Sequence, residues 1–353
     1  MEYIDEIQER VVLVGVQLDE NDNVRESLDE LEELADTAGA VAVGKVIQNR
    51  ETIHPGTYIG KGKIEEVKAL MLAVDATGII CDDELSPAQM NNLEHELECK
   101  VMDRTLLILD IFAKHATTSE GKIQVELAQL RYRASRLVGL GASLSRLGGG
   151  IGTRGPGEKK LESDRRLIRK RITALKEELS QVEKHRELLR TGRTRGKMKT
   201  AAIVGYTNAG KSTLLNTLTG AGVLSEDKLF ATLDPTTRAL TLDDGQQILL
   251  TDTVGFIRKL PHNLVEAFKS TLEEAKYADY IIHVVDCSNP QAEVQMEVVY
   301  DTLHELEVQG KKTITLFNKV DLGPAIFLKD KMADHALKVS AKTGEGLEQL
   351  KEL

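Results

Sequence analysis

A stretch of eight residues, 205–212, has the residue types and the spacing that bind a polyphosphate. Its sequence, Gly-Tyr-Thr-Asn-Ala-Gly-Lys-Ser, fits the pattern G-x-x-x-x-G-K-S/T at every position. Such a loop presents consecutive backbone N–H groups, and the following helix adds the positive end of its dipole, so phosphate is held without bulky side chains. We expect Lys211 to neutralise the outer phosphates and the hydroxyl of Ser212 to bind Mg²⁺. The alternative is a chance match of a Gly- and Ser-rich loop.

The residues on either side of this stretch supply the elements that must position it. The apolar run 201–204 predicts a short buried strand before the loop, and residues 213–218 predict the first turns of a helix after it. A loop that joins a strand to a helix is the context in which this pattern binds phosphate. The flanking elements therefore favour a phosphate-binding loop over a chance match.

A second motif, Asp252-Thr-Val-Gly255, could act on the outer phosphates. It ends the apolar run 248–250, which we expect to pair with 239–242 through the Asp-Asp-Gly turn at 243–245. Asp252 can hold Mg²⁺ through a water molecule, and the N–H of Gly255 can sense a γ-phosphate. The two motifs stand in the order expected of a GTP-binding domain.

The residue after the second motif determines how fast we expect hydrolysis to be. Ras-type GTPases have a glutamine there that orients the attacking water, whereas this chain has Phe256 followed by Ile257. Neither side chain can hydrogen-bond a water molecule. We therefore expect slow hydrolysis by the protein alone and acceleration by a partner, although Arg258 or His262 could replace the missing group.

The choice of base is predicted by residues 318–321, Asn-Lys-Val-Asp, which follow the predicted strand 313–317. The carboxylate of Asp321 can accept both N–H donors on the edge of guanine, and adenine offers no such pair of donors. Residues 340–342, Ser-Ala-Lys, follow another short strand at 337–339 and can supply backbone N–H groups to the guanine O6. These two motifs indicate GTP rather than ATP.

A segment between the first two motifs, residues 230–237, offers three threonines that could coordinate Mg²⁺ and contact the γ-phosphate. We call this segment switch I. Thr232 is the predicted ligand, because its surroundings resemble the aromatic-x-Thr-Leu pattern of related GTPases. Thr236 and Thr237 remain alternatives.

The predicted site comprises five segments of the chain, with GTP or GDP as the nucleotide and Mg²⁺ as the cofactor. Lys211 and Gly255 are the predicted catalytic groups, and Ser212 and Thr232 are the predicted metal ligands. The predicted nucleotide contacts are Gly205, Tyr206, Thr207, Asn208, Ala209, Gly210, Lys211, Ser212, Thr213, Phe230, Ala231, Thr232, Leu233, Asp234, Asp252, Thr253, Val254, Gly255, Asn318, Lys319, Val320, Asp321, Ser340, Ala341 and Lys342.

Composition and length limit the classes of protein to which the chain can belong. Its 353 residues are enough for two or three domains, and 41% of them are hydrophobic. No apolar run approaches the ~18 residues that a membrane span needs, and the acidic N-terminus lacks the features of a signal peptide. The three cysteines form no C-x-x-C pair, and the eight histidines form no metal-ligand spacing. We therefore expect reduced thiols and a cytoplasmic protein without a transmembrane segment.

Charge is distributed unevenly along the chain. The net charge of −10 consists of −16 in residues 1–130, +13 in residues 131–199 and −7 in residues 200–353. A strongly basic segment inside an acidic protein is a candidate contact for a polyanion.

The basic segment contains a glycine-rich stretch, with eight glycines among the nineteen residues 139–157. Backbone N–H groups freed by glycine, together with arginines, suit contact with phosphates and folded RNA. A flexible linker beside a solvated helix face is the alternative, but the basic residues cluster at the same end as the stretch. The predicted RNA contacts are Arg146, Arg154, Lys159, Lys160, Arg165 and Arg166.

The remaining patterns predict the fold class, which is α/β. Strands alternating with helices between residues 10 and 103 predict a small parallel α/β domain. Apolar residues at steps of four and three, at 123–137 and again at 168–182, predict an antiparallel coiled-coil hairpin whose second helix spans about 158–190. The predicted parts are an N-terminal α/β domain at 1–118, the hairpin with its basic loop at 119–192, a linker at 193–197 and a P-loop GTPase domain at 198–353.

With these motifs in place, the chain resembles the HflX family of ribosome-associated GTPases, in the Obg-HflX group. Residues 145–158 resemble the glycine-rich signature of that family, and residues 230–237 resemble its switch I. The resemblance covers nearly the whole chain. It implies an N-terminal α/β domain with a helical hairpin, a GTPase domain, binding to the large ribosomal subunit, and a role in splitting or rescuing idle ribosomes.

The resemblance also raises a question of length. Many bacterial members of the family carry a further C-terminal domain. This chain stops at Leu353, a few residues into a predicted helix that begins near Gly346. We expect either a truncated chain or a short member of the family.

Three functions are compatible with these patterns. The first is a GTPase that binds the large ribosomal subunit and is a monomer away from it. The second is a GTP-dependent RNA maturation or ribosome-assembly factor, and the third is a regulatory switch that binds a protein through the coiled coil. The basic segment favours the first two, because contact with RNA uses positive charge. DNA is not an expected partner.

Overall fold

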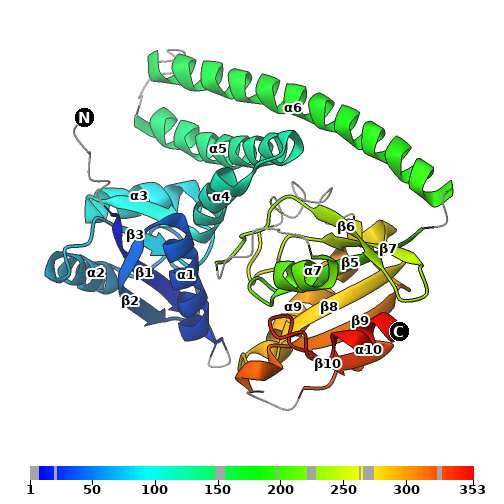
Figure 1. Ribbon diagram of the computed structural model, residues 1–353. Helices are drawn as coiled ribbons and strands as arrows, with labels where there is room; N and C mark the ends of the chain where they lie inside the picture. The colour runs from blue at the N-terminus through cyan, green and yellow to red at the C-terminus, as the bar shows by residue number, and fades with distance from the viewer. Residues whose placement is uncertain are drawn as a thin grey trace, which may run out of the picture. The chain divides into compact units, whose positions relative to one another are not determined.

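The computed structural model describes residues 8–19, 22–147, 156–195, 198–220, 228–261, 264, 274–323 and 328–353. The chain divides into two compact units, one of Met1–Lys114 with Val125–Glu177 and the other of His115–Gln124 with Glu178–Leu353. A four-stranded sheet lies in the first unit and a six-stranded sheet in the second (Figure 1). Among the described residues, no helix combines the length and the apolar character needed to cross a membrane.

The sheet of the first unit has the strand order β2-β1-β3-β4, and each neighbouring pair is parallel. Its strands are β1 (Arg10–Gln17), β2 (Val41–Asn49), β3 (Gly78–Cys81) and β4 (Lys100–Asp103). The helices between them are α1 (Val24–Ala38), α2 (Lys61–Ala73) and α3 (Pro87–Leu97). The parallel α/β arrangement that the sequence predicts for this region is confirmed.

The sequence of each element explains its place in this unit. The central strand β1 is an almost continuous apolar run, as expected for a parallel strand covered on both faces, and its Leu13 is fully buried. Helix α1 buries Leu28, Leu31 and Leu34, which share one face at helical spacing. Helix α3 begins at a capping box, in which Ser86 is the N-cap and Gln89 the third helical residue.

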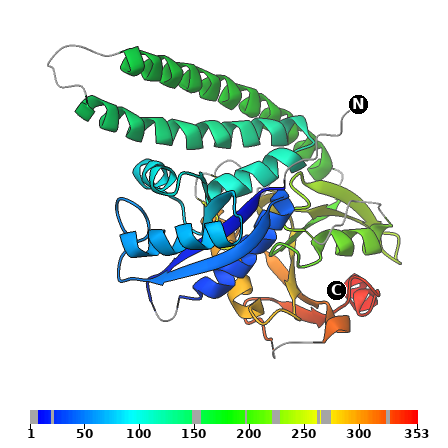
Figure 2. The ribbon, with the colours of Figure 1, turned by 90° about the vertical axis from the view of Figure 1, so that its left-hand side faces the viewer.

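Two long helices follow, α5 (Ser119–Leu147) and α6 (Pro156–Arg195), after the shorter α4 (Arg104–His115). Within the first unit α5 and α6 lie side by side (Figure 2), with Arg171 bonded to Glu126 at 2.7 Å and Arg165 bonded to the carbonyl of Leu137 at 2.5 Å. The earlier residue of α6, Arg165, contacts the later residue of α5, Leu137, so the two helices are antiparallel. Their coiled-coil packing stays a prediction. The predicted division into three domains and a linker also stays a prediction, since both compact units include portions of these helices.

The sheet of the second unit has the order β10-β9-β8-β5-β7-β6, in which only the pair β6–β7 is antiparallel among the described strands. The strands are β5 (Lys199–Gly205), β6 (Thr236–Thr241), β7 (Gln247–Asp252), β8 (Tyr280–Asp286), β9 (Lys312–Asn318) and β10 (His335–Lys338). Helices described in this unit include α7 (Lys211–Thr219), α9 (Ala292–Glu305) and α10 (Leu347–Glu352). The hairpin predicted between 239–242 and 248–250 is confirmed, with Ala239 opposite Leu249.

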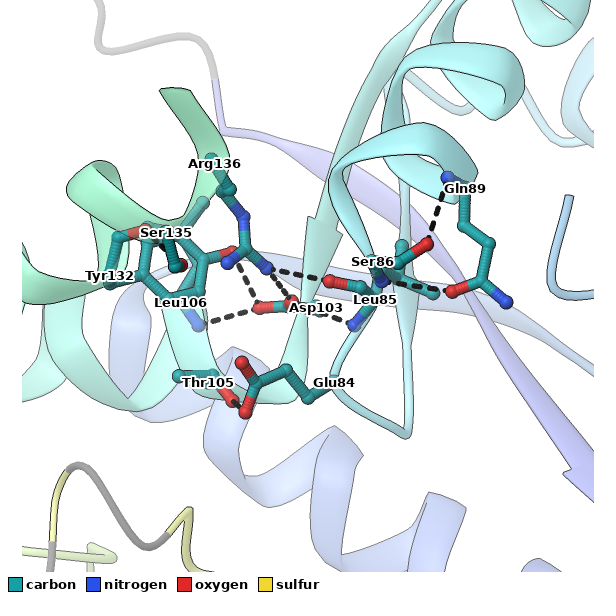
Figure 3. A network of polar contacts seen from close by, with 10 residues as sticks. All are labelled: Glu84, Leu85, Ser86, Gln89, Asp103, Thr105, Leu106, Tyr132, Ser135 and Arg136. Atoms are coloured by element: carbon teal, nitrogen blue, oxygen red, sulfur yellow. Dashed lines mark hydrogen bonds and ion pairs between the residues drawn. The ribbon is translucent and has the colours of Figure 1, made fainter. Parts of the chain in front are cut away.

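The carboxylate of Asp103, at the end of β4, ties α5 to the first sheet (Figure 3). It accepts hydrogen bonds from the backbone N–H groups of Leu85 (3.0 Å) and Leu106 (2.8 Å) and from the hydroxyl of Tyr132 (2.9 Å). The guanidinium of Arg136 donates to the same carboxylate at 2.5 Å and lies 3.3 Å from the centre of the Tyr132 ring. Asp103 is fully buried, and Tyr132 and Arg136 both belong to α5, so a buried charged group fixes this helix.

Replacing Asp103 by alanine should destabilise the protein strongly, because Arg136 and two backbone N–H groups lose their buried acceptor. Removing one partner of a buried ion pair costs about 3–5 kcal/mol, whereas an exposed pair contributes roughly 0–1 kcal/mol. Glu126→Ala, which removes the more exposed pair with Arg171, is the matched control. Urea unfolding followed by circular dichroism measures both variants. If Asp103→Ala lowers the free energy of unfolding no more than the control does, the network around Asp103 contributes little to stability.

Candidate nucleotide-binding site

A cavity of about 350 Å³ lies in the second unit, where the predicted motifs converge. The predicted residues that line it are Thr207, Asn208, Gly210, Lys211, Ser212, Thr213, Phe230, Ala231, Thr232, Thr253, Gly255, Asn318, Lys319, Asp321, Ala341 and Lys342. The predicted residues outside the lining are Gly205, Tyr206, Ala209, Leu233, Asp234, Asp252, Val254, Val320 and Ser340. Lys228 and Leu322 line the cavity without having been predicted. Leu322 directly follows Asp321, which could have indicated it, whereas no pattern points to Lys228.

The phosphate-binding loop joins the end of β5 to the start of α7, which is the context that the sequence predicts. The side chain of Lys211 is buried, and its Nζ donates to the carbonyl oxygen of Tyr206 at 2.7 Å. Burial lowers the pKa of Lys211 to about 8, and the nearby carboxylate of Asp252 opposes this effect. A phosphate bound beside the ammonium would favour its charged form, because an opposite charge stabilises a buried ion.

Three oxygen-bearing side chains meet beside this loop, from α7, switch I and the end of β7. The Oγ of Ser212 lies 2.8 Å from the Oγ1 of Thr232 and donates to the Oδ2 of Asp252 at 2.7 Å. The Oδ1 of Asp252 is buried and has no hydrogen-bond partner among the described residues. Burial raises the pKa of Asp252, while Lys211 and the bond from Ser212 oppose the shift. Hard oxygen ligands, with one carboxylate oxygen still unpartnered, fit Mg²⁺.

The three threonines of switch I differ in where their side chains lie. Thr232 is the one that reaches Ser212. Thr236 and Thr237 belong to β6 and pair with β7, and the Oγ1 of Thr237 lies 2.9 Å from that of Thr251. The geometry therefore favours the predicted choice of Thr232, and its role as a metal ligand stays a proposal.

The segment after β7 is fixed to the phosphate-binding loop by its backbone. The N–H of Thr207 donates to the carbonyl of Phe256 at 2.8 Å, and the N–H of Phe256 donates to the carbonyl of Gly205 at 3.1 Å. A Cβ on Gly255 would lie 2.8 Å from the Cα of Thr207, so only glycine lets the two backbone segments approach this closely. Phe256 is buried, and the Oγ1 of Thr207 is buried without a hydrogen-bond partner among the described residues.

Two residues were predicted as possible replacements for the missing glutamine. The guanidinium of Arg258 bonds to the Oε1 of Gln291 at 3.1 Å, and its backbone N–H donates to the hydroxyl of Tyr206 at 2.8 Å. His262 lies outside the described residues. Arg258 is not among the residues that line the cavity, and the roles of both residues stay predictions.

The other end of the cavity is built by the two motifs predicted to select guanine. Asn318 is buried and braces two loops, since its Nδ2 donates to the carbonyl of Ala209 and its Oδ1 accepts from the N–H of Ala341, each at 2.8 Å. The hydroxyl of Ser340 donates to the Oδ1 of Asp321 at 2.7 Å and orients that carboxylate. Asp321 itself is exposed and lines the cavity, so it can accept from a base.

The predicted RNA contacts lie mainly where the structure is not described. Arg154 is outside the described residues, and so are the side chains of Arg146, Lys159 and Lys160. Arg166 is exposed, whereas Arg165 spends one donor on the carbonyl of Leu137 within the first unit.

Three family models match consecutive parts of the chain. Residues 25–113 match the family described as GTP-binding GTPase N-terminal, and residues 115–193 match the one described as GTP-binding GTPase Middle Region. Residues 200–319 match the family described as 50S ribosome-binding GTPase. This last match contains the phosphate-binding loop, switch I and the second motif.

Whole proteins match over nearly the full length of the chain. A protein of Lacrimispora saccharolytica named GTPase HflX is 69% identical over 98% of this chain and 82% of its own length. A protein of the same name in Escherichia coli is 45% identical over 97% of this chain and 81% of its own. Among solved structures, a GTP-binding protein from the archaeon Sulfolobus solfataricus in complex with GDP aligns with 98% of this chain and 97% of its own, at 26% identity and a TM-score of 0.50.

Asp321→Asn should weaken GTP binding, because an amide donor would face a donor on guanine. The loss of a charge-assisted pair is worth roughly 1.5–3 kcal/mol, which corresponds to an increase in Kd of about 10- to 150-fold. Xanthosine triphosphate carries a carbonyl where guanine carries its amino group, so this variant should bind it better than the parent does. Competition titrations with both nucleotides measure the change, with Asp244→Asn in the β6–β7 turn as the control. Unchanged GTP affinity would show that Asp321 does not read the base.

Proposed function

The chain belongs to the HflX family of GTPases, and on this premise we propose that it binds the large ribosomal subunit and uses GTP hydrolysis to split or rescue idle ribosomes. Its reaction is the conversion of GTP and water to GDP and phosphate. The observation that carries the ribosomal proposal is the match of residues 200–319 to the 50S ribosome-binding GTPases. The net charge of +13 in residues 131–199 supports it, because ribosomal RNA is a polyanion. An action on ribosomes belongs in the cytoplasm.

The phosphate end of the cavity supplies the binding and the charge neutralisation that hydrolysis needs. In this proposal the loop N–H groups hold the phosphates, and the ammonium of Lys211 moves from the carbonyl of Tyr206 to the β- and γ-phosphate oxygens. Ser212 and Thr232 would hold Mg²⁺ directly, and Asp252 would hold it through water. When bound, Mg²⁺ neutralises negative charge on the same phosphates.

In addition to Lys211 and Mg²⁺, the γ-phosphate would be contacted by the backbone of the second motif. The N–H of Gly255 can donate to it, and the unpartnered hydroxyl of Thr207 lines the same part of the cavity. The attacking water, however, has no orienting group at position 256, because Phe256 is apolar and buried. Hydrolysis by the protein alone is therefore slow in this proposal, and docking on the ribosome supplies or orders the missing group.

Single-turnover hydrolysis should be slow without ribosomes and fast with them. We expect a rate on the order of 10⁻⁴–10⁻³ s⁻¹ for the protein alone, as for unassisted Ras, and a large increase when purified large subunits are added. Isolated small subunits at equal concentration are the control. Fast turnover by the protein alone, with no stimulation, would mean that a group within the chain orients the water. Stimulation only by precursor particles would favour an assembly factor.

Arg146→Ala combined with Arg154→Ala should lower co-sedimentation with large subunits and leave nucleotide affinity unchanged. If both residues contact phosphates, each removed contact should also reduce the dependence of log affinity on log salt by about 0.7–0.9. The control is Arg25→Ala with Arg238→Ala, which removes the same charge from other parts of the chain. Equal co-sedimentation of the double variant and the parent at moderate salt would contradict the assigned RNA contacts.

A further inference from the structure

Asp234 in switch I bonds to a part of the chain that precedes it by more than a hundred residues and lies before the nucleotide-binding region. Its Oδ2 accepts from the backbone N–H groups of Thr117 (2.9 Å) and Thr118 (2.8 Å) and from the hydroxyl of Thr117 (2.7 Å). Its Oδ1 accepts from the hydroxyl of Thr118 at 2.5 Å. All of these residues belong to the second compact unit. One carboxylate is thus held by four hydrogen bonds from two adjacent residues.

The partners of Asp234 lie directly before the first turn of α5. Thr118 precedes the helix, and its Oγ1 accepts from the N–H of Gly121 at 2.9 Å in the manner of an N-cap. A carboxylate at this end of a helix is favoured by the positive end of the helix dipole. Gly121 makes the approach possible, because a Cβ at this position would overlap the Oδ1 of Asp234. A glycine in a helix is otherwise unfavourable, so its presence here has a steric reason.

The anchored carboxylate lies two residues after the side chain that meets the metal-binding oxygens. Thr232 and Asp234 are separated only by Leu233, which is 2% exposed. Two residues span at most about 7 Å, so fixing Asp234 restricts where the hydroxyl of Thr232 can lie. In the structure this hydroxyl is 2.8 Å from the Oγ of Ser212 while all four bonds to Asp234 are formed. The anchored arrangement is therefore the one in which Thr232 is placed for Mg²⁺.

We propose that Thr117, Thr118 and Gly121 are positioning residues of the GTPase site, which act through Asp234 to place Thr232. They lie outside residues 200–319, so the site is completed by a segment that the nucleotide-binding region does not contain. The inference rests on the proposed role of Thr232 as a ligand to Mg²⁺ and a contact of the γ-phosphate. GDP lacks the γ-phosphate, so the anchor serves GTP and its hydrolysis far more than GDP binding.

The same contact works in both directions. If the start of α5 favours the placed form of Thr232, then a ligand that binds this form must in turn favour the contact between Asp234 and the start of α5. A non-hydrolysable GTP analogue with Mg²⁺ should therefore protect the amides of Thr117 and Thr118 from hydrogen exchange more than GDP does. The contact at the start of α5 would therefore differ between the GTP-bound and the GDP-bound protein.

Gly121→Ala in the full-length chain tests the inference. The added methyl group should displace Asp234, raise the Mg²⁺ concentration needed for half-maximal hydrolysis, and lower the single-turnover rate with GTP by on the order of ten- to a hundredfold. GDP affinity should change less than twofold. The melting temperature should change little, because alanine favours a helix more than glycine does and so offsets part of the lost bonds to Asp234. The matched control is Gly62→Ala, which adds a methyl group in the first turn of α2 with nothing within 4 Å.

Two further variants separate this inference from the proposal on which it rests. Thr118→Ser keeps the hydroxyl and should behave as the parent, whereas Thr118→Val should behave as Gly121→Ala. Thr232→Ala tests the ligand role directly and should show the same defect in Mg²⁺ dependence. If Thr232→Ala is impaired but Gly121→Ala matches Gly62→Ala, the positioning role is wrong and the ligand role stands. If Thr232→Ala matches the parent, the ligand role fails, and the inference fails with it. Equal exchange at Thr117 and Thr118 with GDP and with the GTP analogue would also overturn it.

Discussion

The contact of Ser212 with both Thr232 and Asp252 joins three segments that are far apart in the sequence. Ser212 is fixed by the start of α7, Asp252 by the end of β7, and Thr232 by the short stretch before β6. These groups are polar and partly or fully buried, and one oxygen of Asp252 has no partner among the described residues. Burying such oxygens is unfavourable unless a cation or further donors satisfy them. Much of the second unit can be understood as the framework that keeps these oxygens together.

Much of this framework could be predicted because its signals are local. The strand, loop and helix around Lys211 follow from consecutive residues, and the hairpin β6–β7 follows from two apolar runs around an Asp-Asp-Gly turn. The preference for Thr232 over Thr236 and Thr237 used only the neighbouring residue types, and the structure places Thr232 alone of the three against Ser212. Local patterns succeed here because turn geometry and helix starts depend on a few adjacent residues.

The interactions that could not be predicted are those between distant residues. The sequence shows an aspartate at 234 and two threonines at 117 and 118, but no pattern indicates that they meet. The same holds for Asp103 with Tyr132 and Arg136, which are about thirty residues away in the chain. Which carboxylate caps which helix depends on how the elements pack, and packing is not encoded in periodicity. Helix ends were also predicted imprecisely. Helix α6 ends at Arg195 rather than near residue 190, because helix ends are weakly specified by the sequence.

Fewer arginines of the basic segment are available for RNA than its net charge suggests. Of the described arginines there, Arg136 pairs with Asp103, Arg171 with Glu126 and Arg186 with Glu120, and Arg165 bonds to a backbone carbonyl. Arg136 holds α5 to the first sheet and the other three side chains join α6 to α5, so these arginines have fewer donors to offer an external phosphate. An exposed residue such as Arg166 keeps its full hydrogen-bonding capacity. Net charge therefore sets the long-range attraction for RNA, while the particular contacts depend on which side chains the fold leaves unused.

Helix α5 is held by a carboxylate at two places, by Asp234 at its first turn and by Asp103 near its middle. The two anchors differ in one physical respect. Asp103 is fully buried, and its acceptors are all used, so this anchor has no low-energy alternative. Asp234 belongs to switch I, the segment predicted to contact the γ-phosphate, and it can exchange its bonds for water at a modest cost. The bonds to Asp103 therefore fix the helix, whereas the bonds to Asp234 can couple the helix to the bound nucleotide. If a partner supplies the water-orienting group, as proposed above, such a coupling would let that partner detect that GTP is bound.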